Sequence, residues 1–229
     1  MPKTIEFRHR AREVSRVEAF SDVVFGFAVS LLVVSLEAPK SYHELVETLR
    51  GFLPFAICFF LLIDIWFEHH DFFKRYALQD RATMALNTLL LFVVLFYVYP
   101  LKFVFTLFAK QLRGEGLDVP PGGATLMFTV YGLGFAAVFA LLAAMYGHAY
   151  KKRDDLGLND VERIDTRESI VDNVCMAAFG IISLVLAQFA PHLAGPIYFL
   201  IAIPKTIVPW VYGVKRRRLE QQVVTCSPA

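Results

Sequence analysis

The stretch RVEAFSDVVFGFAVSLLVVSLEAP, residues 16–39, decides the class of this protein. From Val23 to Leu36 only two serines interrupt a hydrophobic run, whereas Arg16, Ser21 and Asp22 stand at its beginning. A charge beside such a run is costly unless it lies at an interface, has a partner or faces water. The role of these polar residues therefore depends on the kind of protein that surrounds the stretch.

Composition and the distribution of apolar residues indicate a membrane protein. The chain has 229 residues, of which 56% are hydrophobic and 22 are phenylalanine, far more than in an average soluble domain. A helix needs roughly 20 apolar residues to cross a bilayer. The sequence predicts an all-α membrane protein with six transmembrane helices, at about residues 19–36, 51–67, 82–108, 124–150, 170–190 and 196–212.

Lysine and arginine predict the orientation of the chain. If the N-terminus is cytoplasmic, the segments on that side hold 17 of these bases and the outer loops hold 4. Such a bias is typical of membrane proteins, so we expect both termini in the cytoplasm. One six-helix transmembrane domain would then cover residues 1–215 and a flexible cytoplasmic tail residues 216–229. The net charge of +2 gives no reason to expect a nucleic-acid partner.

The polar linker and the cysteines carry less information. Residues 151–169, KKRDDLGLNDVERIDTRES, form the one long polar linker between the expected spans, and Asn159 or Asp160 is suited to cap a short helical lead-in to the fifth. Cys58, Cys175 and Cys226 have no metal or redox spacing. We therefore expect no metal site and no cofactor.

The sequence lacks the motifs of common enzyme classes and of a potassium filter lined by backbone carbonyls. No HExxH, GxSxG or P-loop motif occurs, so an enzyme is not expected. The EHHD stretch at residues 68–71 does not make a metal set, since neighbouring helical residues point in different directions. TVYGLG, residues 129–134, has the letters of a potassium filter in the wrong order, so Gly132 and Gly134 are better explained by close helix packing.

The first expected span carries one regular apolar stripe. Phe27, Leu31 and Val34 follow the spacing i, i+4, i+7 and share a helical face, with Ser30 beside them. Most apolar stripes pack against another helix, and the spacing alone does not distinguish that role from the lining of a pore.

A resemblance to a known family favours the pore. Arg16, Phe20, Ser21 and Asp22 spell RxxxFSD at the start of the first span, and the second span ends in DIWFEHHDFF, residues 64–73. The chain resembles the transmembrane protein 175 family, the lysosomal-type potassium channels and their prokaryotic relatives. The resemblance implies a homotetramer in the prokaryotic cell membrane whose first spans line a pore for potassium and other monovalent cations.

The resemblance also implies the roles of individual residues. The apolar constriction would be formed by Phe27, Leu31 and Val34, with Ser30 as a pore hydroxyl. A structural motif would hold the first span in place, and within it Arg16 and Asp22 would pair with each other. The members of this motif would be Arg16, Phe20, Ser21, Asp22, Trp66, His69 and His70.

The sequence departs from the family pattern at one position, and two alternative functions stay open. The first constriction of the family is usually isoleucine, and here it is Phe27. Four phenylalanine rings at one level would close a dry pore more completely than four isoleucine side chains. Alternatively, the faces of the rings would attract cations weakly. Pro204 and Pro209, with Lys205 between them, are the one hint of a secondary transporter. The other alternative is a non-conducting membrane scaffold.

Overall fold

The described part of the chain is entirely helical. The computed structural model describes residues 7–11, 13–34, 41–42, 45–46, 49, 52–112 and 122–225, and no strand occurs among them. In chain order the elements are α1 (Arg16–Val34), α3 (Phe52–Tyr76), α4 (Arg81–Leu112), α5 (Gly123–Lys151), α6 (Asp160–Phe189), α7 (Pro191–Ala194), the 3-10 helix η1 (Pro196–Ile201) and α8 (Ala202–Thr225). The all-α prediction is therefore confirmed for these residues.

Six long helices follow one another in the order of the six predicted spans. Five described stretches are long and apolar enough to cross a membrane: Arg16–Val34, Arg81–Val98, Thr125–Lys151, Asp160–Phe189 and Pro196–Leu219. The helix α3 is not among the five, and Asp64, Glu68 and Asp71 lie in its second half. Its role as a span stays a prediction.

The bounds of three helices differ clearly from the predicted spans. Helix α3 continues to Tyr76, nine residues beyond the predicted end at residue 67. Helix α6 begins ten residues before residue 170, because Asn159 caps it. The Asn159 side chain accepts a hydrogen bond of 2.8 Å from the Glu162 N–H, and the Glu162 carboxylate accepts one of 3.0 Å from the Asn159 N–H. This reciprocal arrangement is a capping box. Helix α8 continues to Thr225, so the first residues of the expected tail are helical.

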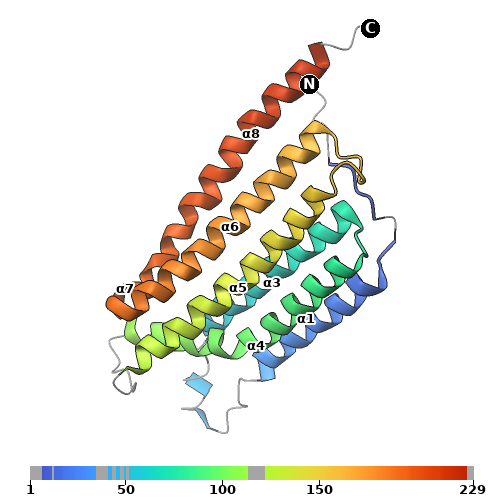
Figure 1. Ribbon diagram of the computed structural model, residues 1–229. Helices are drawn as coiled ribbons and strands as arrows, with labels where there is room; N and C mark the ends of the chain where they lie inside the picture. Colours follow the sequence, from blue (N-terminus) through green and yellow to red (C-terminus); the bar gives the residue numbers. More distant parts are fainter. Residues whose placement is uncertain are drawn as a thin grey trace.

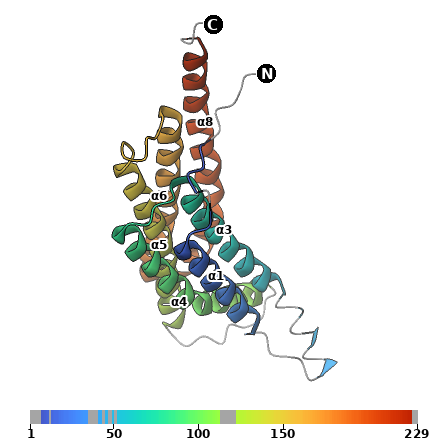
Figure 2. The same ribbon diagram turned by 90° about the vertical axis from the view of Figure 1, so that its right-hand side faces the viewer.

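The helices form a bundle with α1 and α8 at opposite edges (Figure 1). Helix α1 packs against α3 and α4, whereas α5 lies between α4 and α6 and α8 packs on α6. Figure 2 shows α8 extending beyond the other helices at the end where α6 begins. The first and last helices therefore meet different surroundings: of these two, α1 lies beside α3 and α4, and α8 lies beside α6.

Small residues bring α5 and α6 into close contact. A Cβ atom added at Gly132 would lie 2.7 Å from the backbone oxygen of Gly180, and one added at Gly180 would lie 2.7 Å from that of Gly132. No side chain fits between the two backbones at this point, as in other membrane helix pairs with glycine at the contact. The prediction that Gly132 serves helix packing is confirmed.

Candidate functional site

Helix α1 has two distinct faces. The buried residues recur every three or four positions and turn toward α3 and α4; they are Glu18, Ser21, Phe25, Ala28 and Leu32. The exposed residues follow the same period on the opposite side: Phe20, Val23, Phe27, Ser30 and Val34. One face therefore fastens the helix to its own subunit, and the other is left without a partner in the described part of the chain.

The predicted pore residues lie at unequal positions on this exposed face. The side chains of Phe27 and Val34 are prominent, with 56% and 76% of each residue exposed. Ser30 is exposed as well, and its hydroxyl donates a hydrogen bond of 2.9 Å to the backbone oxygen of Gly26. Leu31 is half-buried and packs on the hydrophobic core, so it lies at the edge of the face.

Two polar contacts join α1 to α3. The indole Nε1 of Trp66 donates a hydrogen bond of 2.8 Å to Oδ1 of Asp22. One turn toward the start of α1, the buried carboxylate of Glu18 lies 3.5 Å from Nδ1 of His70. The rings of Trp66 and His70 stack, with their centroids 5.6 Å apart. These contacts orient α1 about its own axis.

Two hydrogen bonds join α1 to α3 through Asn87 of α4, and a third, within α1, precedes them. Ser21 donates to the oxygen of Val17 (2.8 Å), Asn87 donates to Oγ of Ser21 (2.9 Å), and Oδ1 of Asn87 lies 2.7 Å from Nε2 of His69. Because the amide nitrogen of Asn87 already donates to Ser21, its oxygen accepts from Nε2–H of His69. Ser21, His69 and Asn87 are all buried.

Asn87 and Glu18 are members of this network that the motif does not contain. Asn87 is an isolated amide in the apolar run ALNTLLLF, residues 85–92, and a buried amide needs partners. Glu18 lies three residues before Ser21 and shares its face. The spacing could have found both residues, although it does not name the groups that they contact.

A groove lies beside the anchored part of α1. Its volume is about 320 Å³, and it is mostly apolar. It runs between α1 and α3, and its lining residues include Asp22, Phe25, Gly26, Val29, Leu62 and Trp66. A Cβ atom added at Gly26 would meet nothing within 4 Å, so the groove is open there.

Comparison with known proteins places the chain in a family. Residues 16–97, which hold α1, α3 and the first part of α4, match the family model for the endosomal/lysosomal potassium channel TMEM175. A protein of Marivirga tractuosa named "Potassium channel" is 37% identical over 233 residues, covering 94% of both chains. This chain belongs to the TMEM175 family. The family consists of ion channels rather than enzymes, and the chain is a multi-pass protein of the cell membrane.

Two solved TMEM175 structures are similar in fold. The crystal structure of a point variant of the potassium channel MtTMEM175, bound to a nanobody–MBP fusion, has a TM-score of 0.77 and 36% identity, covering 93% of this chain and 97% of that one. A TMEM175 homologue from Chamaesiphon minutus has a TM-score of 0.57 and 24% identity, covering 90% and 99%. The second likeness is one of fold alone.

The TMEM175 motif contains one pair that the structure does not form. The resemblance led us to expect an ion pair between Arg16 and Asp22. Arg16 is exposed and makes no ion pair with any described residue, whereas Asp22 is bonded to Trp66. Asp22 lies six positions after Arg16, so the two side chains point in different directions from the helix. Phe20 of the motif is also exposed, at 62%.

The EHHD stretch of this TMEM175 chain is divided among different partners. His69 is bonded to Asn87, and His70 lies next to Glu18. Asp71 forms an ion pair with Arg75, at 3.2 Å. Among the described residues no group of three or more His, Cys, Asp or Glu side chains is arranged to hold a metal ion.

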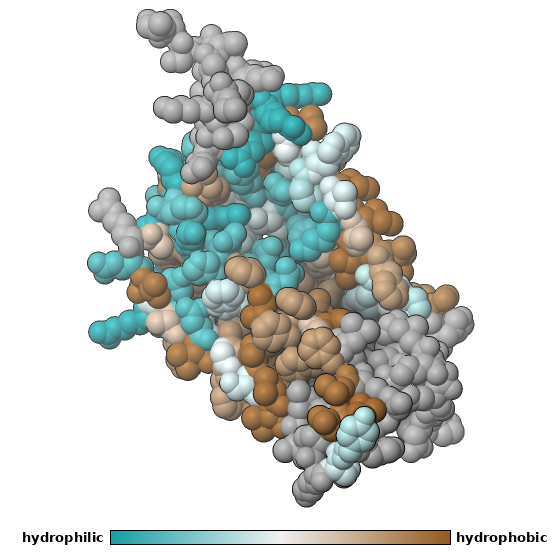
Figure 3. All heavy atoms as spheres, turned by 180° about the vertical axis from the view of Figure 1, so that it is seen from behind, coloured by the Kyte–Doolittle hydropathy of each residue, from teal (hydrophilic) through white to brown (hydrophobic). Residues whose placement is uncertain are grey.

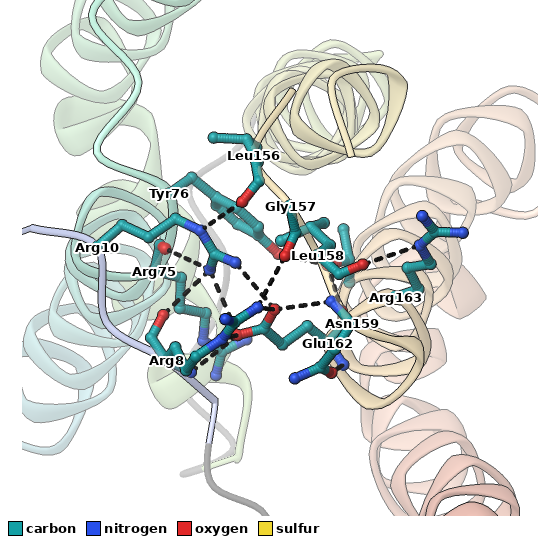
Figure 4. Close-up of polar contacts among 11 residues, drawn as sticks. Arg8, Arg10, Arg75, Tyr76, Leu156, Gly157, Leu158, Asn159, Glu162 and Arg163 are labelled. Carbon is teal, nitrogen blue, oxygen red and sulfur yellow. Dashed lines mark hydrogen bonds and ion pairs between the residues drawn. The ribbon is translucent and has the colours of Figure 1, made fainter. Parts of the chain in front are cut away.

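A second polar cluster fastens the segment before α1 to the start of α6 (Figure 4). The buried carboxylate of Glu162 accepts from Arg8 Nη2 at 3.0 Å and from Arg10 Nη2 at 2.9 Å. Arg8 also donates to the oxygen of Gly157 (2.7 Å), and Arg10 to that of Leu156 (3.0 Å). The segment that leads into α1 is therefore tied to the beginning of α6, more than 140 residues away.

A polar cavity lies away from α1, between α3, α6 and α8. Its volume is about 400 Å³, and its charged lining residues are Glu68, Asp71, Arg75, Asp165, Glu168, Asp172, Lys205 and Arg216. Lys205 Nζ lies 3.2 Å from Asp172 and 3.9 Å from Asp64. The lysine that hinted at a transporter is thus paired with carboxylates of neighbouring helices.

Proposed function

We propose that four copies of this chain form a channel for potassium and other monovalent cations, and that the exposed face of α1 lines its pore. The potassium-channel names of the relatives support the ion. The observation that carries the role of α1 is the opposition of its two faces. Polar contacts hold one face against α3 and α4, and this leaves Phe27, Ser30 and Val34 on the other.

The chemistry of the exposed face suits a pore without a carbonyl filter. Rings of Phe27 and Val34 side chains around a four-fold axis would make a dry neck, which gates ions by dewetting. The hydroxyl proton of Ser30 is used within the helix, so its oxygen lone pairs are available to a cation that has lost part of its water shell. Leu31, at the edge of the face, would narrow the neck less than Phe27 does.

The orientation of the channel follows from charge. We infer that both termini face the cytoplasm, because the polar clusters around Glu162 and Asp165 and the basic end of α8 lie at one end of the bundle. On the face seen in Figure 3 hydrophilic side chains gather toward that end, and hydrophobic ones gather toward the other. The exposed bases at this end, among them Lys74, Arg81, Lys151 and Arg217, agree with the positive-inside bias.

Flux through purified protein in liposomes tests the proposal. Phe27→Ala is expected to raise potassium flux, because a wider apolar neck wets more readily. Phe25→Ala is the matched control: this phenylalanine is 3% exposed, and its truncation is expected to cost about 3–5 kcal/mol of stability without raising flux per folded channel. If the two variants lost stability alike and neither changed the flux, α1 would not line the pore.

A further inference from the structure

Helix α8 contacts the bundle along one side only. Lys205 and Arg216 face α6, where they pair with Asp172 at 3.2 Å and Asp165 at 3.4 Å. Elsewhere the helix is largely bare, since only 6% of the apolar stretch that η1 and α8 form together is buried. Ile203, Ile207 and Trp210 are each more than half exposed. In the proposed tetramer α1 lines the pore, and α8 lies at the opposite edge of the bundle, so we expect these side chains to face lipid.

Trp210 indicates how deep α8 lies in the membrane. Tryptophan is enriched at the level of the lipid headgroups, and Trp210 is 66% exposed. Arg217 follows seven residues later, so it shares the face of Trp210 and lies about 10 Å further along the helix axis. Because a helical side chain tilts back toward the start of its helix, the guanidinium reaches the lipid phosphates near Trp210.

Three of the four consecutive bases at residues 215–218 have no acidic partner within the part of the chain that the structure describes. Arg216 turns inward to Asp165, whereas Lys215, Arg217 and Arg218 are exposed and form no ion pair with a described residue. Lys215 Nζ lies 5.0 Å from the centre of the Tyr212 ring, which leaves its N–H donors available. Arg217 uses Nε to donate to the oxygen of Gly213 (3.2 Å) and keeps its outer nitrogens available.

We propose that this basic end of α8 is a binding surface for the headgroups of anionic phospholipids. Arginine forms two parallel hydrogen bonds with a phosphate, and lysine adds a point charge. Each base near an anionic membrane surface contributes to the attraction, which falls off within a Debye length. Anionic lipid therefore collects around Trp210 rather than evenly around the channel.

Tryptophan quenching by brominated lipid tests this surface. The chain has two tryptophans, Trp66 and Trp210, and Trp66 is half-buried against Asp22. The protein is placed in mixed vesicles in which the bromine is carried either by phosphatidylglycerol or by phosphatidylcholine, at equal mole fractions. The expected result is stronger quenching by the brominated phosphatidylglycerol. The triple variant Lys215→Ala, Arg217→Ala and Arg218→Ala should lower this enrichment roughly fivefold or more.

A matched triple variant separates a local surface from a general charge effect. Lys74, Arg81 and Lys151 are exposed bases near the same end, on α3, α4 and α5. Their replacement by alanine removes the same charge and should leave the enrichment at Trp210 unchanged. Equal quenching by both lipids in the unaltered protein would overturn the proposal. So would equal losses in the two triple variants, or displacement of the lipid by millimolar soluble glycerophosphate.

Discussion

The indole Nε1 of Trp66 donates a hydrogen bond of 2.8 Å to Oδ1 of Asp22 and thereby joins the middle of α3 to the second turn of α1. The bond ends on a carboxylate, and hydrogen bonds to ionised groups are stronger than neutral ones. Asp22 is half-buried, so it depends on this donor more than a fully exposed carboxylate would. The contact sets the direction in which the exposed face of α1 points.

Trp66→Phe keeps a ring but removes the donor, and we expect it to lower stability by about 1–3 kcal/mol. Asp22→Asn should cost less, because its amide oxygen still accepts from Trp66. Thermal unfolding in detergent, followed by size-exclusion chromatography, measures both variants. Flux per folded channel should stay unchanged. If Asp22→Asn kept its stability and changed only the preference between potassium and sodium, Asp22 would belong to the ion pathway.

Asn87 is predicted to be more important for stability than its absence from the motif suggests. Asn87→Leu would leave Nε2–H of His69 buried without an acceptor, and one lost partner of this kind costs about 1–3 kcal/mol. Thr88→Leu, next to it on an exposed position, is the control. A double-mutant cycle of Asn87→Ala with Ser21→Ala should show non-additive loss, since the two residues share one bond. Additive effects would mean that the hydrogen-bond chain does not act as a unit.

The two arginines before α1 should differ in their effect on stability. Arg10 is 17% exposed in its side chain and Arg8 60%, although both bind Glu162. Arg10→Ala is therefore expected to lower the melting temperature more than Arg8→Ala, because buried partners are more costly to lose. Glu162→Gln should be more harmful than either, since it removes the charged partner of both arginines at once. Equal melting temperatures of all three variants and the unaltered protein would show that the cluster adds no stability.

The contacts of Asp80, in the turn before α4, predict that the stability of the protein depends on pH. Burial alone would raise the pKa of Asp80, but hydrogen bonds from Thr83 and His148 and the nearby Lys152 outweigh it and lower the pKa. A lowered pKa adds stability above the ordinary carboxyl value of about 4, and this contribution is lost as the pH falls through the lowered pKa. Asp80→Asn should therefore melt below the unaltered protein at pH 7, and the difference should shrink below about pH 4. A difference that stays constant across this range would refute the assignment.

Cysteine labelling tests the orientation of the bundle. Asp155 is exposed in the turn between α5 and α6, and Leu193, 47% exposed, lies at the other end in α7. With Cys226 replaced by serine, Asp155→Cys should react with a membrane-impermeant maleimide only from the cytoplasmic side. Leu193→Cys should react only from outside. The reverse pattern would invert the proposed topology.

The order of the long helices could be predicted from the sequence because apolar runs and helical periodicity are local properties of the chain. The run after Asp22 predicted α1, and Gly132 predicted a close contact of helices. Asn159 is a capping residue that the sequence identifies by type. The RxxxFSD letters and the Trp66 and His69 stretch identified the family before any contact was known. In each case the signal lies within a few residues of its effect.

Only the tertiary structure decided which polar groups meet. Asp22 is bonded to Trp66 rather than to Arg16, and Ser21 reaches His69 through Asn87. Arg10 reaches Glu162 across 152 residues of sequence. The structure also places Leu31 at the edge of the α1 face, although Leu31 fits the spacing of Phe27 and Val34. The physical reason is that backbone geometry sets the direction of each side chain around its own helix, whereas the packing of several helices determines which hydrogen-bonding groups come within reach.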